Sequence, residues 1–242
     1  MINLESPQAP DAAYIRTMFD RMARRYDAFT ALIGLGQTHR WRAHALEPLR
    51  PGMRVLDLGC GTGDLALAAA ARVGPSGEVV GLDFSGDMLA VAAHKARVRR
   101  TPAWGPVRWV QARAEDLPLP DAPFDMVVSG FVLRNLYANI DAILAGMKAS
   151  LRPGGRVRLL DLTEPKRAPL RAVFRAYLLG PVGLYGALLF GRDYPVPYLP
   201  DSAQRFWKAD EFVAALRRAG FSDVTRRSFL FGTVTLYDAA RP

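Results

Sequence analysis

The chain has 242 residues, of which half are apolar and 23% are charged, and this composition predicts a globular protein with one full core. The single cysteine, Cys60, excludes an intrachain disulfide and favours a reducing cytoplasm. The net charge of +9 favours contact with anionic lipid or nucleic acid. Residues 1–11 lack the pattern of a secretory signal, and we find no apolar run of the roughly 20 residues that a membrane span needs.

The first 50 residues predict helices. Between Ala12 and Tyr26 the apolar residues recur at helical spacing, with arginines on the opposite face. Pro51-Gly52 then makes a turn before the first strand. We expect the helices of residues 11–50 to form part of a cap on a single domain that spans residues 1–242.

A strand, a glycine turn and a helix follow at residues 55–73. The strand Val55-Leu56-Asp57-Leu58 runs into three alternating glycines, Gly59, Gly61 and Gly63, before an alanine-rich helix. Glycines allow a close approach of the backbone to a ligand because they have no Cβ. The spacing G-x-G-x-G after an acidic strand end is typical of an S-adenosylmethionine (SAM) site rather than a dinucleotide site. A loop of another α/β protein is the alternative.

Strands and helices alternate after this turn. Strands are predicted at residues 78–83, 107–111, 124–131 and 157–162, with helices at 86–99 and 140–151. Residues 223–229 and 233–239 predict an antiparallel hairpin at the end of the chain. The fold class is therefore α/β, with a doubly wound, mostly parallel sheet of seven strands. Residues 169–190 are apolar, and Gly180-Pro181 is expected to break them into two helices of an insert, residues 168–205, that completes the cap.

Two acidic residues fit the polar parts of SAM. Asp83 lies twenty residues beyond Gly63, at the end of the second strand, where its carboxylate can accept hydrogen bonds from both ribose hydroxyls. Asp57 can face the ammonium group of the methionine part, and Phe84 and Met88 offer apolar surface beside the adenine. The alternative for Asp83 is a charge at a helix N-terminus.

Five landmarks resemble class I SAM-dependent methyltransferases: Asp57–Gly63, Asp83, Ala114, Phe124-Asp125 and Leu151–Gly155. The resemblance implies that Arg113 and Ala114 flank the adenine and that Thr62, Ser129 and Gly130 neighbour the cofactor. Arg113 stands where the family usually has an acid or amide, and a guanidinium cannot accept a hydrogen bond. The adenine would then be contacted by the backbone at Ala114 or by Glu115.

A closer resemblance, to the C-methyltransferases of ubiquinone and menaquinone biosynthesis, covers nearly the whole chain. It is carried by Tyr26-Asp27, Gly36, Trp41, Leu133-Arg134-Asn135, Tyr198-Leu199 with Ser202, Ala219-Gly220-Phe221 and Phe231-Gly232. The resemblance implies methylation of a ring carbon of a polyprenyl quinol, either demethylmenaquinol or a ubiquinol precursor. It also implies catalytic roles for Arg134, Asn135 and Tyr26 near the quinol hydroxyls and a catalytic water, with Asp27 as a further candidate. An ion pair to an interior acid is the alternative for Arg134.

Departures from this family gather on the acceptor side and leave the quinone open. They are Phe29-Thr30, Gly34, Thr38, Tyr237, and Asp161 with Thr163. A methyltransferase of another lipid-like or phenolic acceptor, including a phospholipid amine, is the first rival function. A SAM-binding or lipid-binding partner without turnover is the second.

The expected partners are a lipid-soluble quinol and an anionic membrane surface. Arg171, Arg175 and Arg192 flank the apolar insert, as in a peripheral protein at the inner face of the cytoplasmic membrane. Simple packing of the insert or a homodimer interface is equally open. No nucleic-acid partner is expected, because the chain has no Asn/Asp-Pro-Pro-Tyr motif. No metal is expected either, because the three histidines have no spacing that suggests shared coordination.

Overall fold

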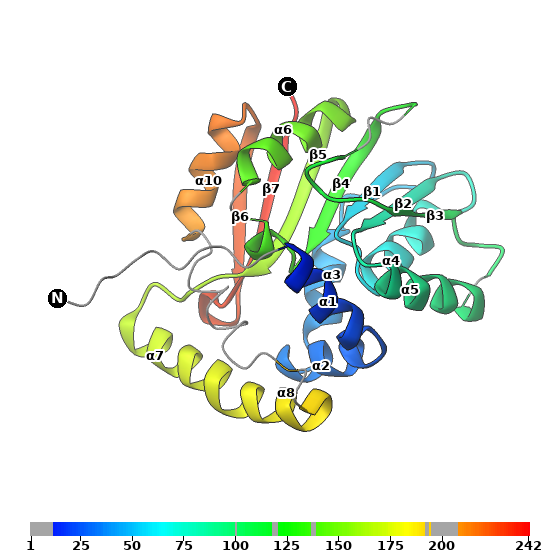
Figure 1. Ribbon diagram of the computed structural model, residues 1–242. Helices are drawn as coiled ribbons and strands as arrows, with labels where there is room; N and C mark the ends of the chain where they lie inside the picture. Colours follow the sequence, from blue (N-terminus) through cyan, green and yellow to red (C-terminus); the bar gives the residue numbers. More distant parts are fainter. Residues whose placement is uncertain (1–11, 100, 118–120, 137–138, 192–193, 195–207) are drawn as a thin grey trace.

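Seven strands form one twisted sheet in the computed structural model, which describes residues 12–99, 101–117, 121–136, 139–191, 194 and 208–242 (Figure 1). The strand order is β3-β2-β1-β4-β5-β7-β6. The bounds are β1 Arg54–Leu58, β2 Glu78–Asp83, β3 Val107–Gln111, β4 Phe124–Gly130, β5 Leu151–Leu162, β6 Ser222–Phe229 and β7 Val234–Ala240. All neighbours are parallel except β7, which is antiparallel to both β5 and β6. The predicted fold class, with its C-terminal hairpin, is confirmed.

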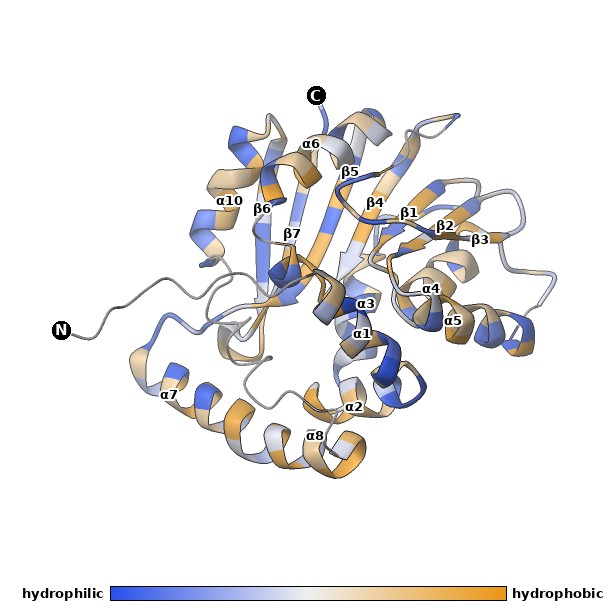
Figure 2. Cartoon of the chain, in the orientation of Figure 1, coloured by the Kyte–Doolittle hydropathy of each residue, from blue (hydrophilic) through white to orange (hydrophobic). Residues whose placement is uncertain are grey.

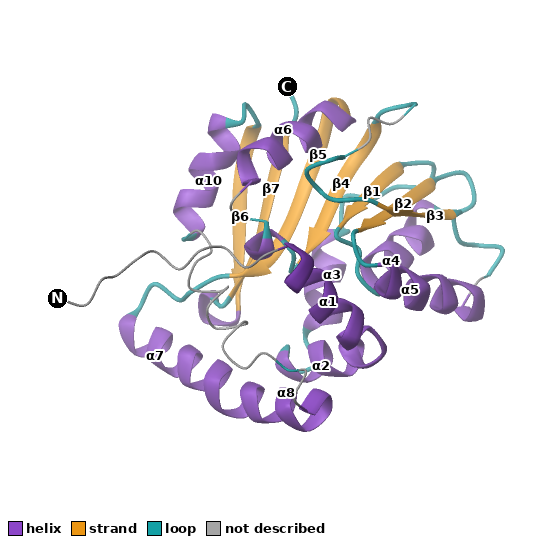
Figure 3. Cartoon of the chain, in the orientation of Figure 1, coloured by secondary structure: helices purple, strands orange, loops and turns teal. Residues whose placement is uncertain are grey.

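Helices cover both faces of the sheet (Figure 3). Leu56, Leu58 and Val127 point to one face, where they pack against α6 (Ile140–Ser150) and α10 (Ala209–Arg218). Val55 and Val128 point to the other face and pack against α4 (Asp64–Val73), while α5 (Gly86–Arg99) contacts β2 and β3. Burial on both faces explains why these strands read as continuous apolar runs in the sequence.

The strand order reverses between β1 and β4, in the middle of the sheet. Ligands of open α/β sheets bind at such a point, outside the carboxyl ends of the strands. The glycine turn follows β1 at this edge, Asp83 ends β2, and Gly130 ends β4. The topology therefore brings together three motifs that lie far apart in the sequence.

A cap of helices lies over the same end of the sheet (Figure 1). It consists of α1 (Ala12–Met22), η1 (Ala23–Arg25), α2 (Tyr26–Ile33) and α3 (Thr38–Ala45), together with α7 (Ala168–Tyr177), η4 (Leu178–Val182) and α8 (Gly183–Phe190). The two parts share one apolar cluster, in which Met18, Met22 and Phe29 meet Phe174 and Leu178. The Tyr177 hydroxyl also donates a hydrogen bond of 3.1 Å to the carbonyl of Ile33.

The predicted break at Gly180-Pro181 is wrong. Residues 168–190 form one helical run, in which Leu178–Val182 is a π-helix that contains Pro181. A π-helix has i→i+5 hydrogen bonds and so adds a residue to the turn, and Pro181 lies in this wider segment without an N–H to donate. The run is 23 residues long and, by length and composition alone, apolar enough to cross a membrane. This finding also contradicts the sequence reading that no apolar segment reaches such a length.

The strand β5 begins six residues before the predicted Val157. Gly154 N donates to the carbonyl of Arg241 at 2.9 Å, and Arg241 N donates to the carbonyl of Gly155 at 2.8 Å. The segment that ends α6 is therefore already paired with the end of the chain. Two short 3-10 turns, η2 (Leu133–Asn135) and η6 (Leu230–Gly232), complete the cap side. The predicted site motif at Tyr198, Leu199 and Ser202, Arg192, and most of residues 192–205 lie outside the described residues.

Candidate active site

Two neighbouring cavities lie at the carboxyl ends of the strands. The first, of about 620 Å³, lies between the glycine turn, α1 and the loops after β2 and β3, and we call it the sheet-edge cavity. The second, of about 310 Å³, lies between the cap helices and the loops that follow β4 and β5, and we call it the cap cavity. Four residues line both cavities: Phe19, Tyr26, Thr30 and Phe131. These four form a shared wall.

The three glycines of the turn have different surroundings, although all three have positive φ angles of 69°, 52° and 82°. A Cβ at Gly59 would lie 2.6 Å from the side chain of Val132, and one at Gly63 would lie 2.8 Å from Ala92 and Trp109. A Cβ at Gly61 would meet nothing within 4 Å. Gly59, Gly61 and Thr62 line the sheet-edge cavity, whereas Gly63 supports the turn from behind.

Asp83 lies at the floor of the sheet-edge cavity. Its carboxylate accepts hydrogen bonds from the backbone N–H of Gly61 at 2.8 Å and of Ser85 at 2.9 Å. Burial raises the pKa of Asp83, against the effect of these backbone donors. The Phe84 backbone also acts as a donor to this carboxylate. A carboxylate has about four acceptor sites, so the group can still accept from a ligand. Phe84 and Met88 line the same cavity, and their place beside an adenine stays a prediction.

Asp57 lies behind the glycine turn, near the end of β1. It is fully buried and does not line the cavity, and neither carboxylate oxygen has a hydrogen-bond partner among the described residues. Burial raises its pKa to about 7, while the charge of Arg42 acts in the opposite direction. A buried carboxylate without partners is costly unless a positive group approaches it. The position therefore fits a cationic ligand group on the far side of the turn.

The other predicted cofactor residues divide into two groups. Arg113, Ala114 and Gly130 line the sheet-edge cavity, and Glu115 lines it beside them. The Arg113 guanidinium pairs with Glu115 at 3.3 Å, so the acid supplies the acceptor that Arg113 lacks. Ser129 is not a lining residue, because its hydroxyl is buried in the sheet and donates to the carbonyl of Leu58 at 2.7 Å.

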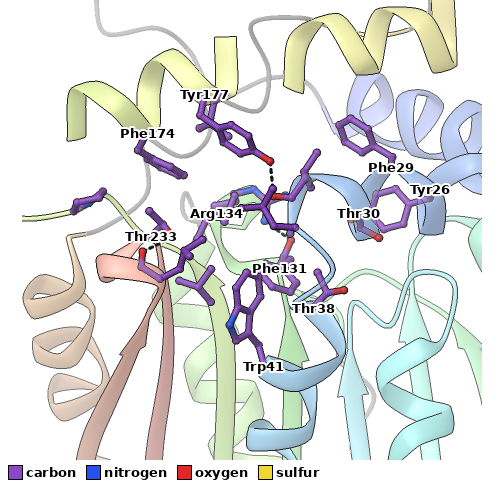
Figure 4. A pocket seen from close by; sticks show the side chains of 18 of the residues that line it. Tyr26, Phe29, Thr30, Thr38, Trp41, Phe131, Arg134, Phe174, Tyr177 and Thr233 are labelled. Atoms are coloured by element: carbon purple, nitrogen blue, oxygen red, sulfur yellow. Dashed lines mark hydrogen bonds between the residues drawn. The ribbon is translucent and has the colours of Figure 1, made fainter. Parts of the chain in front are cut away.

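Arg134 lies at the inner end of the cap cavity (Figure 4). Its side chain is 6% exposed, and Nη1 donates to Asp161 at 2.9 Å and to the carbonyl of Phe131. Its backbone N–H also donates to Asp161, at 3.0 Å. The ion pair that the sequence left as the alternative is thus present, and the guanidinium also faces the cavity.

The rest of the cap cavity is mainly apolar (Figure 4). Phe174 and Tyr177 reach into it from α7, and Tyr26 and Phe29 come from α2. Burial raises the pKa of the Tyr26 hydroxyl, although Arg134 and Arg42 lower it, so this group stays protonated at neutral pH. Tyr26 can therefore donate a hydrogen bond into either cavity but is a poor base.

Two predicted participants in proton transfer lie elsewhere. Asn135 lines the sheet-edge cavity rather than the cap cavity. Asp27 lines neither cavity, because it accepts hydrogen bonds from Lys95 at 2.7 Å and from the Thr62 hydroxyl. Lys95 also pairs with Asp64, which follows the glycine turn. Asp27 therefore fastens the cap to the turn.

The shared wall contains a strained residue. Phe131 has a φ of +65°, which costs a residue with a side chain roughly 1–2 kcal/mol. Its N–H donates to Leu160 at 2.7 Å, its carbonyl accepts from Arg134, and its ring lies 6.3 Å from that of Trp41. These contacts hold the ring between the two cavities. Strain of this kind is common at functional sites.

Comparison with known proteins agrees with this geometry. The sequence model of the ubiE/COQ5 methyltransferase family matches residues 8–241. The chain belongs to this family. A ubiquinone/menaquinone biosynthesis C-methyltransferase of Geobacter sulfurreducens is 36% identical over 92% of this methyltransferase and 86% of the relative. A demethylmenaquinone methyltransferase of Thermus thermophilus is also 36% identical, over 93% of this methyltransferase and all of the relative.

Solved structures share the fold of this SAM-dependent methyltransferase at low sequence identity. The crystal structure of the [4+2]-cyclase SpnF covers 98% of both chains with a TM-score of 0.69 and 18% identity. A SAM-dependent methyltransferase from Aquifex aeolicus has a TM-score of 0.60 at 19% identity, and the match covers 83% of this methyltransferase and 89% of that chain. Because one fold accompanies a cyclase and a methyltransferase, the fold alone does not identify the acceptor.

Sequence reasoning missed several residues of this methyltransferase's site. Arg42 and Asp20 line the sheet-edge cavity, from α3 and α1. Arg42 follows Trp41, which carried part of the resemblance, but one more arginine in an arginine-rich segment gives no signal of its own. Phe19 and Phe131 of the shared wall also have no motif, because their importance arises only when the cap closes over the sheet.

Proposed function

We propose that the chain transfers the methyl group of SAM to a ring carbon of a polyprenyl quinol, either demethylmenaquinol or a ubiquinol precursor. One observation carries the proposal: a mainly apolar cavity with a buried guanidinium at its inner end shares a wall with the sheet-edge cavity. A quinol has the same division, with polar ring oxygens at one end and a long apolar tail at the other.

The sheet-edge cavity suits SAM. Asp83 keeps acceptor capacity for the ribose hydroxyls beside its backbone donors, and Gly61 leaves room for a close ligand. Asp57 supplies a buried negative charge for the ammonium group. When bound, SAM supplies a methyl group on a positively charged sulfur. The protein's part is to hold that group in line with the acceptor carbon and to exclude water.

The quinol ring would lie at the shared wall and the tail would follow the cap helices. Tyr26 and Arg134 offer hydrogen-bond donors at the inner end of the cap cavity. Phe174 and Leu178 line the path outward, and Leu35 and Phe231 line the cavity and are exposed. The tail can therefore leave the cavity between apolar side chains.

Arg134 would stabilise the reactive form of the ring. Loss of a phenolic proton to water raises the nucleophilicity of the ring carbon, which then bonds to the methyl carbon as the sulfur–carbon bond breaks and S-adenosylhomocysteine is left. The ring carbon afterwards loses its hydrogen as a proton to water, which restores the aromatic ring. A guanidinium stays charged at any working pH, so Arg134 holds the phenolate and does not act as the base. Tyr26, kept protonated by burial, donates a second hydrogen bond to the same oxygen.

A membrane surface would deliver the substrate. Val173, Leu179, Leu184 and Leu188 are exposed along the helical run of residues 168–190, and Phe231 is 79% exposed at the cavity. Figure 2 shows this run as largely hydrophobic, with hydrophilic turns on α7, where Arg171 and Arg175 lie. Exposed apolar side chains beside basic ones are typical of a helix that lies in the membrane interface. We therefore propose a peripheral protein at the cytoplasmic face of the membrane.

The acceptor is tested with labelled SAM and a set of candidate acceptors. Demethylmenaquinol, a ubiquinol precursor and phosphatidylethanolamine are each supplied in detergent micelles, with product identification by mass spectrometry. Label on a ring carbon of either quinol supports the proposal, and the same quinol without its tail should react less efficiently. Label on the amine lipid alone would replace the proposal with the phospholipid function.

The membrane surface is tested with vesicles. Wild-type protein should bind anionic vesicles more than neutral ones, and salt should weaken the binding. The double variant L184S/L188S should bind less, whereas V98S, which removes an equally exposed side chain from α5, should bind normally. Equal binding of all three proteins would contradict the proposed surface. A concentration-dependent dimer that L184S/L188S abolishes would instead assign the same face to a second copy.

A further inference from the structure

Arg42 lies where the glycine turn meets the cap. It belongs to α3 and lines the sheet-edge cavity beside Gly59, Gly61 and Thr62. Its Nη1 donates to Asp64 at 2.8 Å, and Asp64 is the residue directly after Gly63. The side chain is only 17% exposed. A mostly buried guanidinium therefore lies at the end of the cavity that is next to the first residue of α4.

The charge of Arg42 acts on the buried acid below the turn. It has the largest influence of any charged group on the pKa of Asp57, and it opposes the rise that burial causes. It also lowers the pKa of Tyr26, in the shared wall. Arg42 and Tyr26 also line the same cavity, so Arg42 lies near both Tyr26 of the shared wall and the buried Asp57.

The other arginines that line this cavity have different positions. Arg16 is on α1, with a side chain that is 56% exposed and 3.7 Å from Asp20. Arg113 is 52% exposed and pairs with Glu115, next to Ala114 at the predicted adenine end. Among the described lining residues, Arg42 is the basic group that is both mostly buried and next to the glycine turn.

The methionine part of SAM carries an ammonium and a carboxylate on one carbon. A site for this group needs a negative and a positive side chain near each other. Arg42 lines the cavity, and its charge is the strongest single charge acting on the buried Asp57 carboxyl behind the turn. A guanidinium has five N–H donors in a planar fork that matches a carboxylate. One of them is used on Asp64. We infer that Arg42 binds the α-carboxylate of the methionine part of SAM.

This inference deepens the proposed function, because it names a contact within the SAM site. It concerns SAM alone and requires no acceptor, so it can succeed even if the quinol assignment fails. The competing explanation is that Arg42 only joins the cap to α4 through its ion pair with Asp64. The two explanations differ in what they predict for a ligand that lacks the carboxylate.

The experiment compares SAM with decarboxylated SAM by isothermal titration calorimetry without acceptor. Wild-type protein should bind SAM roughly 10- to 100-fold more tightly, since a hydrogen-bonded charge pair is lost in the second ligand. R42Q should bind SAM and S-adenosylhomocysteine more weakly by a similar factor, while its affinity for decarboxylated SAM stays close to that of wild type. R42K should recover part of the difference.

Two control variants distinguish a direct contact between Arg42 and SAM from a purely structural role of Arg42. R40Q removes an exposed charge from the same helix and should leave both affinities unchanged. D64N breaks the Arg42 ion pair but keeps the guanidinium, so it should preserve the preference for SAM over decarboxylated SAM. If R42Q lost affinity for SAM and for decarboxylated SAM equally, and D64N did the same, Arg42 would have only the structural role. That result would overturn the inference. Equal affinity of wild-type protein for the two ligands would also overturn it, whatever the stability of the variants.

Discussion

The two cavities of this methyltransferase are built in different ways. The sheet-edge cavity is formed by the ends of adjacent strands, and its polar contacts include the backbone N–H groups of Gly61 and Ser85. The cap cavity is formed by side chains from segments that are distant in the sequence, and Arg134 is its buried cation. The first cavity therefore has a local sequence signature, while the second depends on the packing of the cap. Variants that affect one cavity and spare the other test this division.

Among the variants, R134M should give the largest difference between its effect on methyl transfer and its effect on SAM binding. Removal of the guanidinium should lower kcat/KM for methyl transfer by roughly 100- to 1000-fold, the usual cost of losing a group that stabilises an oxyanion. SAM affinity should change less than about threefold, since Arg134 does not line the sheet-edge cavity. Labelled methyl transfer and calorimetry measure the two quantities.

The buried ion pair complicates this variant, because Asp161 loses its partner. The double variant R134M/D161N removes both charges and should recover stability in thermal unfolding but not turnover. R152M is the matched control, because it removes an exposed arginine near the start of β5, whereas Asp161 lies near the end of that strand. Normal turnover in R134M, or an equal loss of SAM affinity, would contradict the separation of the cavities.

The glycine turn allows a comparison within the first cavity. G63A should lower the free energy of unfolding by about 2–4 kcal/mol, because a positive φ and a 2.8 Å contact with Ala92 and Trp109 both oppose a methyl group. G61A has the positive φ but no neighbour, so it should lose about half as much stability. Urea unfolding measures both. If G61A proved the less stable variant, the assignment of Gly63 to packing would be wrong.

D83A addresses the proposed ribose contact. Loss of the carboxylate should weaken SAM binding by roughly 10- to 100-fold, because both its ligand contacts and its bonds to Gly61 and Ser85 disappear. Calorimetry with SAM and with S-adenosylhomocysteine should show similar losses, since the two ligands share the ribose. SAM affinity equal to that of wild type would reject the assignment.

The smallest effect is a pH dependence from Asp57. With a pKa of about 7, this carboxyl is half ionised at neutral pH, and the ionised form binds an ammonium group better. SAM affinity should therefore rise severalfold between pH 6 and pH 8, and D57N should remove that rise. In the protein without ligand, stability changes with pH in the direction opposite to SAM affinity. A raised carboxyl pKa means that the contribution of Asp57 to stability is lost as pH rises from about 4 to about 7. Thermal unfolding of wild type and D57N across this range measures the difference.

The sequence predicted the sheet better than the cap, for physical reasons. The strands of the sheet are short apolar runs closed by glycine, proline or acidic residues, and these local signals placed both strands of the C-terminal hairpin within one residue. The helical run of residues 168–190 was predicted to break, because proline usually ends a helix and a π-turn has no clear local signature.

The candidate site shows the same contrast. The spacing of Asp57, the glycines and Asp83 pointed to the sheet-edge cavity. The sequence did not show that Gly63 and Ser129 lie outside its lining, or that Asp57 is fully buried behind the turn. Arg134 was found only through the family resemblance, and its partner Asp161 was not predicted as such. The wall residues Phe19 and Phe131 were missed, because their positions depend on contacts between the cap and the sheet.

The shared wall has a thermodynamic consequence. Since Phe19, Tyr26, Thr30 and Phe131 belong to both cavities, an occupant of one cavity restricts the side chains that contact an occupant of the other. The two binding equilibria are then linked. The factor by which a bound cofactor product changes the affinity for a quinol must equal the factor by which the quinol changes the affinity for that product. Titrations in either order therefore report a single coupling free energy.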